Sequence, residues 1–306
     1  MKNPNPDMLL FIAQADACAV AVEFTQDTEL TEEVLKFERY CEHPKYDLGA
    51  GQYTDDTQMS VANAEVLCLF DNPTPLYFAN AWVECFHRDP RKGYAGGFQK
   101  FLERTRTGKD FLRDIRPWSE KNGAAMRSVP LGVLPNPDDV VDVATLQAEI
   151  THNTLVGRYG SIAVALMSHW ALYHAEDNVL DFDELWSFVR EHLPEQCVGL
   201  WDDVVDSPWE DNRRILSTTD TVNAVYHSIL GADDMMEVLE RIVRWGGDTD
   251  SCSAVAWGVA SSLPWMKDSK SAEEIPEWMY KELEPNGQFG PQYLQDLGKS
   301  LMAKYS

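Results

Sequence analysis

The sequence predicts an all-α fold, arranged as a single compact multi-helix domain over residues 1–306. Three observations support this prediction. Apolar residues recur at the 3.6-residue spacing of helices along most of the chain. Runs of alternating Val, Ile and Thr, which are typical of strands, are nearly absent. Neither an internal repeat nor a linker-like stretch divides the chain.

The first helix is expected at residues 7–23, where two acidic residues interrupt a pattern of apolar and small side chains. Alanines at alternate positions from 13 to 21 predict close packing against another helix. Asp16 is interpreted either as a hydrogen-bonded buried acid or as part of a site, because an unpaired buried charge is costly. Glu23, where the pattern ends, either caps the helix or points into a cleft.

Residues 24–52 are mixed, and a second helix is predicted to begin after Thr54. Thr54 is a good N-cap residue, and Asp55 and Asp56 fall in the first turn, where the helix dipole favours negative charge. The apolar stripe of residues 59–70 continues this helix. For one such motif alone, capping is the commoner explanation.

The same periodicity predicts the remaining helices. They fall at about residues 79–87, 98–107, 139–150, 155–174, 181–193, 197–206, 219–231 and 233–245. The segment 155–174 is apolar around so much of its circumference that we expect it to be buried on most sides. Residues 264–306 are expected to form a closing C-terminal segment, in which several prolines favour short helices.

The charge of the chain limits its partners. Lys and Arg total 26 against 50 Asp and Glu, which gives a net charge of -24. Such a charge repels the phosphates of nucleic acids and anionic membranes, and it suits divalent cations. The composition therefore argues against a nucleic-acid scaffold role.

The cysteines and the N-terminal residues indicate where in the cell the protein is expected to occur. The six cysteines show no paired CxxC spacing and are interpreted as buried free thiols of a reducing environment. The N-terminal apolar run lacks the basic flank and the full-length core of a signal peptide, and no apolar run approaches the ~20 residues of a membrane span. We therefore expect a cytoplasmic protein with no membrane partner, and the sequence leaves its oligomeric state open.

Two acidic motifs at helix starts suggest a site for divalent metal ions. They are Thr54-Asp55-Asp56-Thr57 and, far downstream, Gly246-Gly247-Asp248-Thr249-Asp250-Ser251. Magnesium and manganese prefer oxygen ligands, and these motifs offer carboxylates and hydroxyls without sulfur or nitrogen. A calcium loop of the EF-hand type is excluded, because Ser253 would occupy its glycine position and Val259 that of its final glutamate.

Two irregular segments are candidates for ligand contacts. Residues 89–97 form a turn-rich loop with two basic residues and three glycines. This loop either cradles a phosphate through backbone N–H groups or is a plain connector. Residues 122–127 contain small side chains that permit a close approach of the backbone. His152, at the front of the long apolar segment, is a further candidate.

Together these pieces resemble the ADP-ribosylglycohydrolase family, which includes the dinitrogen-reductase-reactivating enzymes and the ADP-ribosylserine hydrolases. The matching motifs, in the family's order, are residues 16–23, Thr54-Asp55-Asp56-Thr57, residues 89–97, Asn122-Gly123-Ala124-Ala125-Met126-Arg127, Thr151-His152 and Gly246-Gly247-Asp248-Thr249-Asp250-Ser251. Each motif is weakly specific by itself, whereas the ordered set is strongly specific. The loop and the Asn-Gly-Ala-Ala-Met-Arg stretch are closest to the serine-hydrolase branch.

The resemblance implies an all-α fold with a two-metal centre between helix ends, which holds two divalent cations, Mg²⁺ or Mn²⁺. The implied metal ligands are Thr54, Asp55, Asp56, Asp248, Asp250 and Ser251. The resemblance implies that the cations bind the hydroxyls of the distal ribose of ADP-ribose while water attacks the anomeric carbon of that ribose. Glu23 or Asp56 would be the catalytic base. The implied substrate-binding residues are Gly93, Tyr94, Gly96, Asn122, Gly123, Met126 and His152.

Trp118 is a further candidate, because a tryptophan can stack on an adenine ring, although burial is the default for this residue.

Three departures from the family's pattern are also present. Ala15 and Ala19 stand where the family has glycines, and Ser251 stands where threonine is common. Lys121 replaces a glycine that often precedes Asn-Gly, which bears on the diphosphate or adenosine pocket.

The expected function is a metal-dependent hydrolase that removes ADP-ribose from an N- or O-linked acceptor, on a protein or a small molecule. The alternative is a non-catalytic protein that binds ADP-ribose or metal on the same scaffold. Retention of all six ligand positions and of Glu23 favours the enzyme, because a binding protein has no need of a base. The sequence does not specify whether the acceptor is arginine, serine, a nucleic-acid end or a small molecule, and it does not decide between Mg²⁺ and Mn²⁺.

Overall fold

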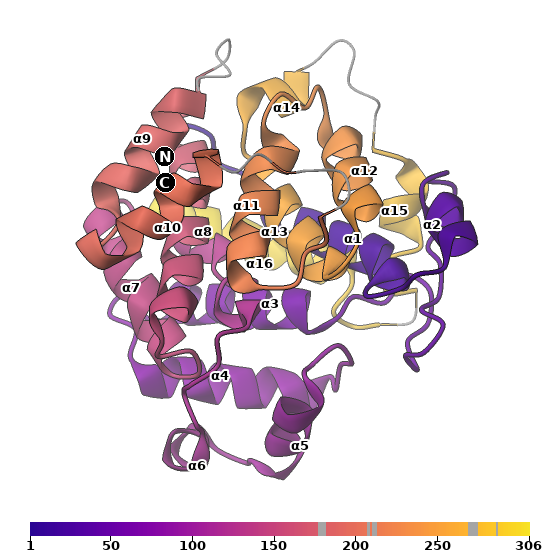
Figure 1. Cartoon of the computed structure of the whole chain (residues 1–306). Helices are drawn as coiled ribbons and strands as arrows, with labels where there is room; N and C mark the ends of the chain where they lie inside the picture. Colours follow the sequence, from indigo (N-terminus) through magenta and orange to yellow (C-terminus); the bar gives the residue numbers. More distant parts are fainter. Residues whose placement is uncertain (177–181, 207–208, 210–212, 269–274, 286) are drawn as a thin grey trace.

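Helices α1 (Met8–Ala19) and α13 (Thr249–Ala260) lie side by side near the centre of the protein, as seen in a computed structural model (Figure 1). The structure describes residues 1–176, 182–206, 209, 213–268, 275–285 and 287–306. Over these residues it contains sixteen α-helices and three 3-10 helices, and only isolated β-bridges pair extended backbone. The predicted all-α fold is confirmed.

Most of the predicted segments are helices with nearly the expected bounds. They are α3 (Asp55–Leu69), α4 (Pro75–Arg88), α5 (Gly96–Arg104), α7 (Pro137–Glu149), α8 (Leu155–Tyr173), α9 (Phe182–His192), α10 (Glu195–Asp206), α11 (Thr218–Ile229) and α12 (Met235–Trp245). Residue 181, which begins one predicted segment, lies outside the described residues. The first predicted helix is divided, because α1 is followed by the 3-10 helix η1 (Val20–Val22) just before Glu23.

Small side chains allow α1 and α13 to approach each other closely. The alanines of α1 at positions 13, 15, 17 and 19 are fully buried, as their spacing predicts. A Cβ atom built on Gly258 of α13 would lie 2.8 Å from Ile12 Cγ1. Because packed interiors leave little free volume, a larger residue at this position would force the helices apart. The contact fixes the end of α1 relative to the start of α13.

Helices α3 and α8 pack around the pair formed by α1 and α13. Helix α3 packs against α1, α4 and α16 (Pro291–Tyr305), and its N-cap is Thr54, as predicted. The Thr54 hydroxyl accepts a hydrogen bond from the backbone nitrogen of Asp56 at 3.3 Å. Helix α8 is buried along most of its length, which confirms the prediction, and it packs against α7, α11 and the 3-10 helix η3 (Val129–Val133).

Several elements were not identified from the sequence. They are α2 (Thr28–Val34), α6 (Gly108–Asp114), α16 and the 3-10 helices η2 (Asn122–Ala124) and η3. Helices α2 and α6 have only seven residues each, which is too short for a periodic pattern. The C-terminal segment begins with the expected short helices, α14 (Pro264–Asp268) and α15 (Glu277–Lys281), but it ends in α16, a fifteen-residue helix.

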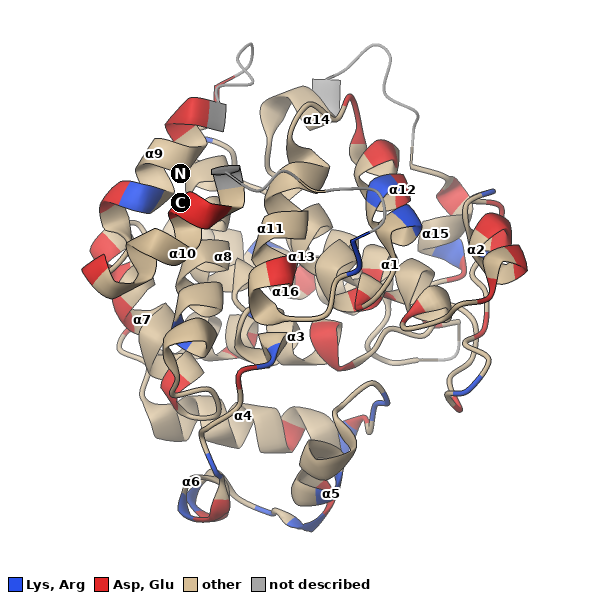
Figure 2. Ribbon diagram, viewed as in Figure 1, with Lys and Arg blue, Asp and Glu red and all other residues tan. Residues whose placement is uncertain are grey.

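Charged residues are distributed unevenly over the protein. Asp and Glu occur on most helices, whereas Lys and Arg gather around α5, α6 and the adjoining loops (Figure 2). Within the described residues, none of the helices has both the length and the apolar character needed to cross a lipid bilayer.

Candidate active site

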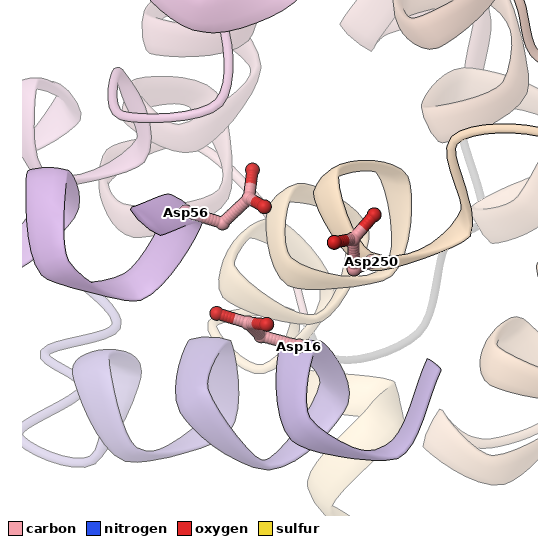
Figure 3. Close-up of side chains that lie close together, drawn as sticks. All are labelled: Asp16, Asp56 and Asp250. Atoms are coloured by element: carbon pink, nitrogen blue, oxygen red, sulfur yellow. The ribbon is translucent and has the colours of Figure 1, made fainter. Parts of the chain in front are cut away.

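Three carboxylates from distant parts of the sequence converge near the centre of the protein. Asp16 comes from α1, Asp56 from the first turn of α3 and Asp250 from the first turn of α13 (Figure 3). Each contributes a carboxylate oxygen, and these oxygens lie within 4.8 Å of one another. All three side chains are buried. The fold therefore brings the two predicted acidic motifs together.

Asp16 holds the first turn of α3 in place. Its Oδ1 accepts a hydrogen bond from the Thr54 hydroxyl at 2.9 Å, and its Oδ2 accepts one from the Thr57 hydroxyl at 2.6 Å. The backbone nitrogens of the same two threonines also donate to this carboxylate. Burial raises the pKa of Asp16 to about 6, although these hydrogen bonds oppose the shift. Asp16 is thus a hydrogen-bonded buried acid that also belongs to the acidic cluster.

Three buried carboxylate oxygens have no hydrogen-bond partner among the described residues. They are Asp56 Oδ1, Asp250 Oδ1 and Glu23 Oε2. Burial raises the pKa of Asp56 and of Asp250 well above the ordinary value, and the charges of neighbouring carboxylates add to both shifts. Buried charges of this kind are stable when a cation balances them. These hard, open oxygen atoms match what a divalent cation such as Mg²⁺ requires.

A second group of carboxylates adjoins the first and shares Asp250 with it. Oxygens of Glu23, Asp248 and Asp250 lie within 4.8 Å of one another. Asn122 Nδ2 donates hydrogen bonds to Asp248 Oδ2 at 3.0 Å and to Thr221 Oγ1 at 3.1 Å. Asn122, a predicted substrate contact, therefore also orients an acid of the cluster.

The two glycines before Asp248 make the sharp turn that precedes α13. Their φ angles are 68° at Gly246 and 95° at Gly247, a region that favours glycine. A Cβ atom on Gly247 would lie 2.1 Å from the carbonyl oxygen of Ile215, which also accepts a hydrogen bond from Asp248 N at 3.0 Å. Asp248 is the N-cap residue of α13, but its side chain makes no capping hydrogen bond. Capping therefore does not account for this aspartate.

Glu23 follows η1 directly and is held by two residues that were not identified from the sequence. The Tyr46 hydroxyl hydrogen-bonds its carboxylate, and His43 Nε2 lies 3.2 Å from its carbonyl oxygen. The rings of His43 and Tyr46 stack with centroids 3.8 Å apart. Burial and, secondly, the charge of Asp248 raise the pKa of Glu23 to about 8. No local spacing connects Glu23 with this ring pair, so the sequence carries no signal for it.

The glycine-rich loop of residues 89–97 lies directly on Asp55. Gly93 has a φ of 102°, and a Cβ atom there would lie 2.1 Å from Asp55 Oδ1. Arg91 is buried in an ion pair with Glu284, so one of the two basic residues of the loop is structural. The close approach explains why the loop needs glycine at position 93.

The carboxylates of both groups, apart from the fully buried Asp16, line one cavity of about 1010 Å³ together with the loop. The predicted site residues that line it are Glu23, Asp55, Asp56, Gly93, Tyr94, Gly96, Asn122, Gly123, Met126, His152, Asp248, Asp250 and Ser251. Thr54 is fully buried beside it, with its hydroxyl 3.0 Å from Asp56 Oδ2. The Ser251 hydroxyl also hydrogen-bonds Asp56.

Trp118 does not line this cavity. Its side chain is 73% exposed, so the default expectation of burial is wrong. Its neighbours Arg116 and Ser119 line the cavity instead. The backbone of Trp118 forms an isolated bridge with His152, and this bridge is its connection to the site.

Basic side chains also line the cavity. They are Lys45, Lys92, Arg104, Arg116, Lys121 and the buried Arg127. They bring positive charge close to the carboxylates, so the cavity can accept an anionic ligand in a protein of net charge -24. Lys92, Lys121 and Arg127 lie in or beside motifs that were identified from the sequence, whereas no sequence signal connected Lys45, Arg104 and Arg116 with a ligand.

Fold and site define an all-α protein in which buried carboxylates suited to divalent cations adjoin a cavity of ligand-binding size. Comparison with known proteins narrows this class. The profile of the ADP-ribosylglycohydrolase family matches residues 7–304. The chain belongs to this family, which confirms the resemblance found in the sequence.

Individual relatives cover most of the chain at low identity. The ADP-ribosyl-[dinitrogen reductase] glycohydrolase of Rhodospirillum rubrum is 25% identical over 281 residues, which span 89% of this chain and 87% of that protein. ADP-ribosylhydrolase ARH3 of Mus musculus is 26% identical over 274 residues, which span 74% and 71%. A solved structure of an ADP-ribosylglycohydrolase-related protein complex has a TM-score of 0.70 at 19% identity and covers 98% of this chain and 97% of that chain. This likeness shows a shared fold.

Proposed function

We propose that this chain is a metal-dependent hydrolase that cleaves the glycosidic bond between ADP-ribose and an N- or O-linked acceptor. The observation that carries the proposal is the set of partnerless buried oxygens of Glu23, Asp56 and Asp250 beside a cavity of about 1010 Å³. Membership of the family supports the same class, and the Rhodospirillum rubrum and mouse relatives bear the names of ADP-ribosyl hydrolases. The acceptor is a protein side chain, a nucleic-acid end or a small molecule.

Two divalent cations, Mg²⁺ or Mn²⁺, are the proposed cofactors. The residues that would hold them are Thr54, Asp55 and Asp56 before and on α3, and Asp248, Asp250 and Ser251 before and on α13. The two carboxylate groups that share Asp250 support two adjacent positions. When bound, the cations would orient the distal ribose and stabilise charge on its oxygens.

Glu23 is the proposed general base, and Asp56 is the alternative. Glu23 lines the cavity, and its Oε2 has no donor among the described residues, while Tyr46 holds the carboxylate. Its carboxylate would take a proton from the water that attacks the anomeric carbon as this carbon gains oxocarbenium character. A base with a pKa near neutrality suits this task and contributes about 100- to 10,000-fold. Asp56 is less suited, because its carboxylate already accepts a hydrogen bond from Ser251 and is itself a proposed metal ligand.

The remaining lining residues form the proposed wall for the diphosphate and the distal ribose. They are Gly93, Tyr94, Gly96, Asn122, Gly123, Met126 and His152. The backbone amides of the loop and the exposed Lys92, Arg104 and Lys121 would offset the charge of a diphosphate. Trp118 is not included in this wall, because its exposed ring does not line the cavity.

The test is incubation with peptides ADP-ribosylated on arginine or on serine, with Mg²⁺ or with EDTA. We expect cation-dependent release of free ADP-ribose from one of the two peptides. Asp250→Ala and Asp55→Ala should abolish release, whereas Asp139→Ala, an exposed residue of α7, should leave it unchanged.

Glu23→Gln separates an enzyme from a binding protein. Because this variant keeps the shape of the side chain and loses the base, it should bind ADP-ribose while turnover falls at least about 100-fold. Saturable binding by the native protein without release from any substrate would favour the non-catalytic alternative. Full activity of Asp250→Ala in Mg²⁺ would contradict the metal-dependent mechanism.

A further inference from the structure

Arg127 is a buried cation without a carboxylate partner among the described residues. Its side chain is 1% exposed, and its guanidinium carbon lies 4.0 Å from the ring centroid of Trp82. The guanidinium donates hydrogen bonds to the side chain and carbonyl of Gln147 and, at 2.8 Å, to the Thr151 hydroxyl. Burial lowers the pKa of Arg127 to about 9, so it stays charged at neutral pH. Since arginine has only donors, the Thr151 oxygen must act as the acceptor in this contact.

The hydroxyl of Thr151 also lies 2.6 Å from His152 Nδ1. Because one lone pair of the oxygen is taken by Arg127, the hydroxyl hydrogen is directed elsewhere, and His152 Nδ1 is the one acceptor that the described residues place within its reach. His152 Nδ1 therefore accepts this hydrogen, and the single proton of a neutral ring must lie on Nε2. Burial and the charge of Arg127 lower the pKa of His152 to about 3, which keeps the ring neutral.

The other edge of the ring borders the cavity. His152 is a lining residue, and Nε2 forms no hydrogen bond within the described part of the chain. A Cβ atom built on Gly123 would lie 3.2 Å from Nε2 and 3.1 Å from Cε1, so the glycine leaves this edge uncovered. Backbone hydrogen bonds from Asn153 N to Pro117 O, at 2.7 Å, and from Ser119 N to Thr151 O, at 3.4 Å, hold the segment in place.

We propose that Arg127, through Thr151, fixes the proton of His152 on Nε2, so that His152 presents a constant N–H donor to an oxygen of the bound substrate. Thr151 and Arg127 are positioning residues, and His152 is a binding residue that does not exchange protons with the substrate. The identity of that substrate as ADP-ribose rests on the proposed function, whereas the position of the proton does not. A neutral, fixed donor recognises an acceptor oxygen without the desolvation cost of a second buried charge.

The first test is the tautomer of His152 in the native protein. Long-range ¹H–¹⁵N spectra of protein with ¹⁵N-labelled histidine distinguish a protonated from an unprotonated ring nitrogen, and the His152→Gln variant identifies the signals that belong to this residue. We expect Nε2 to be protonated and Nδ1 to be unprotonated, with no change across neutral pH. Protonation of Nδ1, or a ring that titrates near neutrality, would overturn the proposal.

The second test removes the hydroxyl while keeping the shape of the side chain. Thr151→Val should give a mixture of tautomers or move the proton to Nδ1, and it should weaken binding of ADP-ribose about tenfold. Thr151→Ser keeps the hydroxyl and should restore both the native spectrum and the native affinity. An unchanged tautomer in folded Thr151→Val would show that Thr151 does not position the proton.

These tests separate the inference from the proposed function. If the tautomer is as expected but no ADP-ribosylated substrate is cleaved, only the proposed function fails. If substrate is cleaved while Nδ1 carries the proton, only the proposed positioning of the His152 proton by Arg127 and Thr151 fails.

Discussion

Asp16 of α1 accepts hydrogen bonds from both the backbone nitrogen and the hydroxyl of Thr54, at 3.0 and 2.9 Å, and Thr54 is the residue that caps α3. A carboxylate on the first helix therefore positions the helix start that carries Asp55 and Asp56. Because Thr54 and Thr57 are fully buried, water has no access to replace this acceptor. The acidic end of α3 thus depends on a residue 38 positions away in the sequence.

The first prediction isolates this acceptor by comparing two uncharged variants. Asp16→Ala leaves the buried donors of both Thr54 and Thr57 unpaired, whereas Asp16→Asn keeps a carbonyl oxygen for the donors of one of the two threonines. We expect Asp16→Ala to have a free energy of unfolding about 2 kcal/mol lower than that of Asp16→Asn, because each unpaired buried donor costs about 1–3 kcal/mol. Urea unfolding in EDTA measures the difference. Equal stabilities would show that Asp16 does not organise α3.

The second prediction concerns Asp250, which belongs to both carboxylate groups. Mg²⁺ at about 100 times its dissociation constant should stabilise the native protein by about 2.7 kcal/mol. The Asp250→Asn variant should show little or no such gain in thermal melts. In EDTA the same variant should be more stable than the native protein, because one buried charge beside Glu23 and Asp56 is removed. An equal Mg²⁺ effect on both proteins would exclude Asp250 as a ligand.

The third prediction is that the metal-free protein loses stability as the pH rises from about 4.5 to about 8. Glu23 has an ordinary pKa of 4.5 and a pKa of about 8 in the fold, so between these values the folded protein holds a proton that the unfolded chain has released. This contribution is fully present below pH 4.5 and is lost as the pH rises through 8. Asp16, with a pKa raised to about 6, adds to the loss in the lower part of this range.

Urea unfolding across this pH range, with EDTA and with Mg²⁺, measures the slope. The loss should amount to a few kcal/mol in EDTA and should shrink in Mg²⁺, since a bound cation takes the place of the protons. A stability that stays level or increases with pH in EDTA would contradict the raised pKa values.

The helices were predictable wherever the apolar pattern is long. Helix α8 has enough buried positions to show its burial from sequence. Helix α16 has few buried residues, and one of them is Gly298, where an added Cβ atom would lie 2.0 Å from the carbonyl oxygen of Pro6. A glycine inside a helix lowers its propensity, and the contact that requires it is set by the N-terminal segment. Such a tertiary requirement leaves no local pattern.

In the candidate site, too, some features are determined by neighbouring residues and others only by tertiary contacts. The turn at Gly246 and Gly247 and the cap at Thr54 are determined by neighbouring residues, so both acidic motifs could be identified from the sequence. Tyr46 reaches Glu23 only because the chain folds back between them. Trp118 is exposed although tryptophan is usually buried, and its backbone rather than its ring contacts the site, in the bridge to His152.

The fourth prediction tests the support of Glu23 by Tyr46. Tyr46→Phe removes a hydrogen bond that lowers the pKa of Glu23, so this pKa should rise further. We expect kcat to fall about tenfold, as for the loss of one hydrogen bond to a charged group. If Glu23 is the base, the limb of the pH profile on which activity rises with pH should move to higher pH. Tyr280→Phe, a partly exposed tyrosine outside the cavity, is the matched control. An unchanged profile in Tyr46→Phe would remove Tyr46 from the mechanism.

The last prediction concerns the glycine that lets the loop lie on Asp55. In Gly93→Ala the new methyl group would lie 2.1 Å from Asp55 Oδ1 and 2.9 Å from Thr54 Cβ, at a φ of 102° that disfavours any side chain. The loop must move away, which should cost at least about 1 kcal/mol of stability and displace Asp55. Both the Mg²⁺-dependent rise in melting temperature and the hydrolysis of the substrate should then decrease. Gly199→Ala on α10, where no described residue outside the helix's own backbone places an atom within 4 Å of the added Cβ, should leave both unchanged. If the two variants behave alike, the close contact between the loop and Asp55 has no part in metal binding.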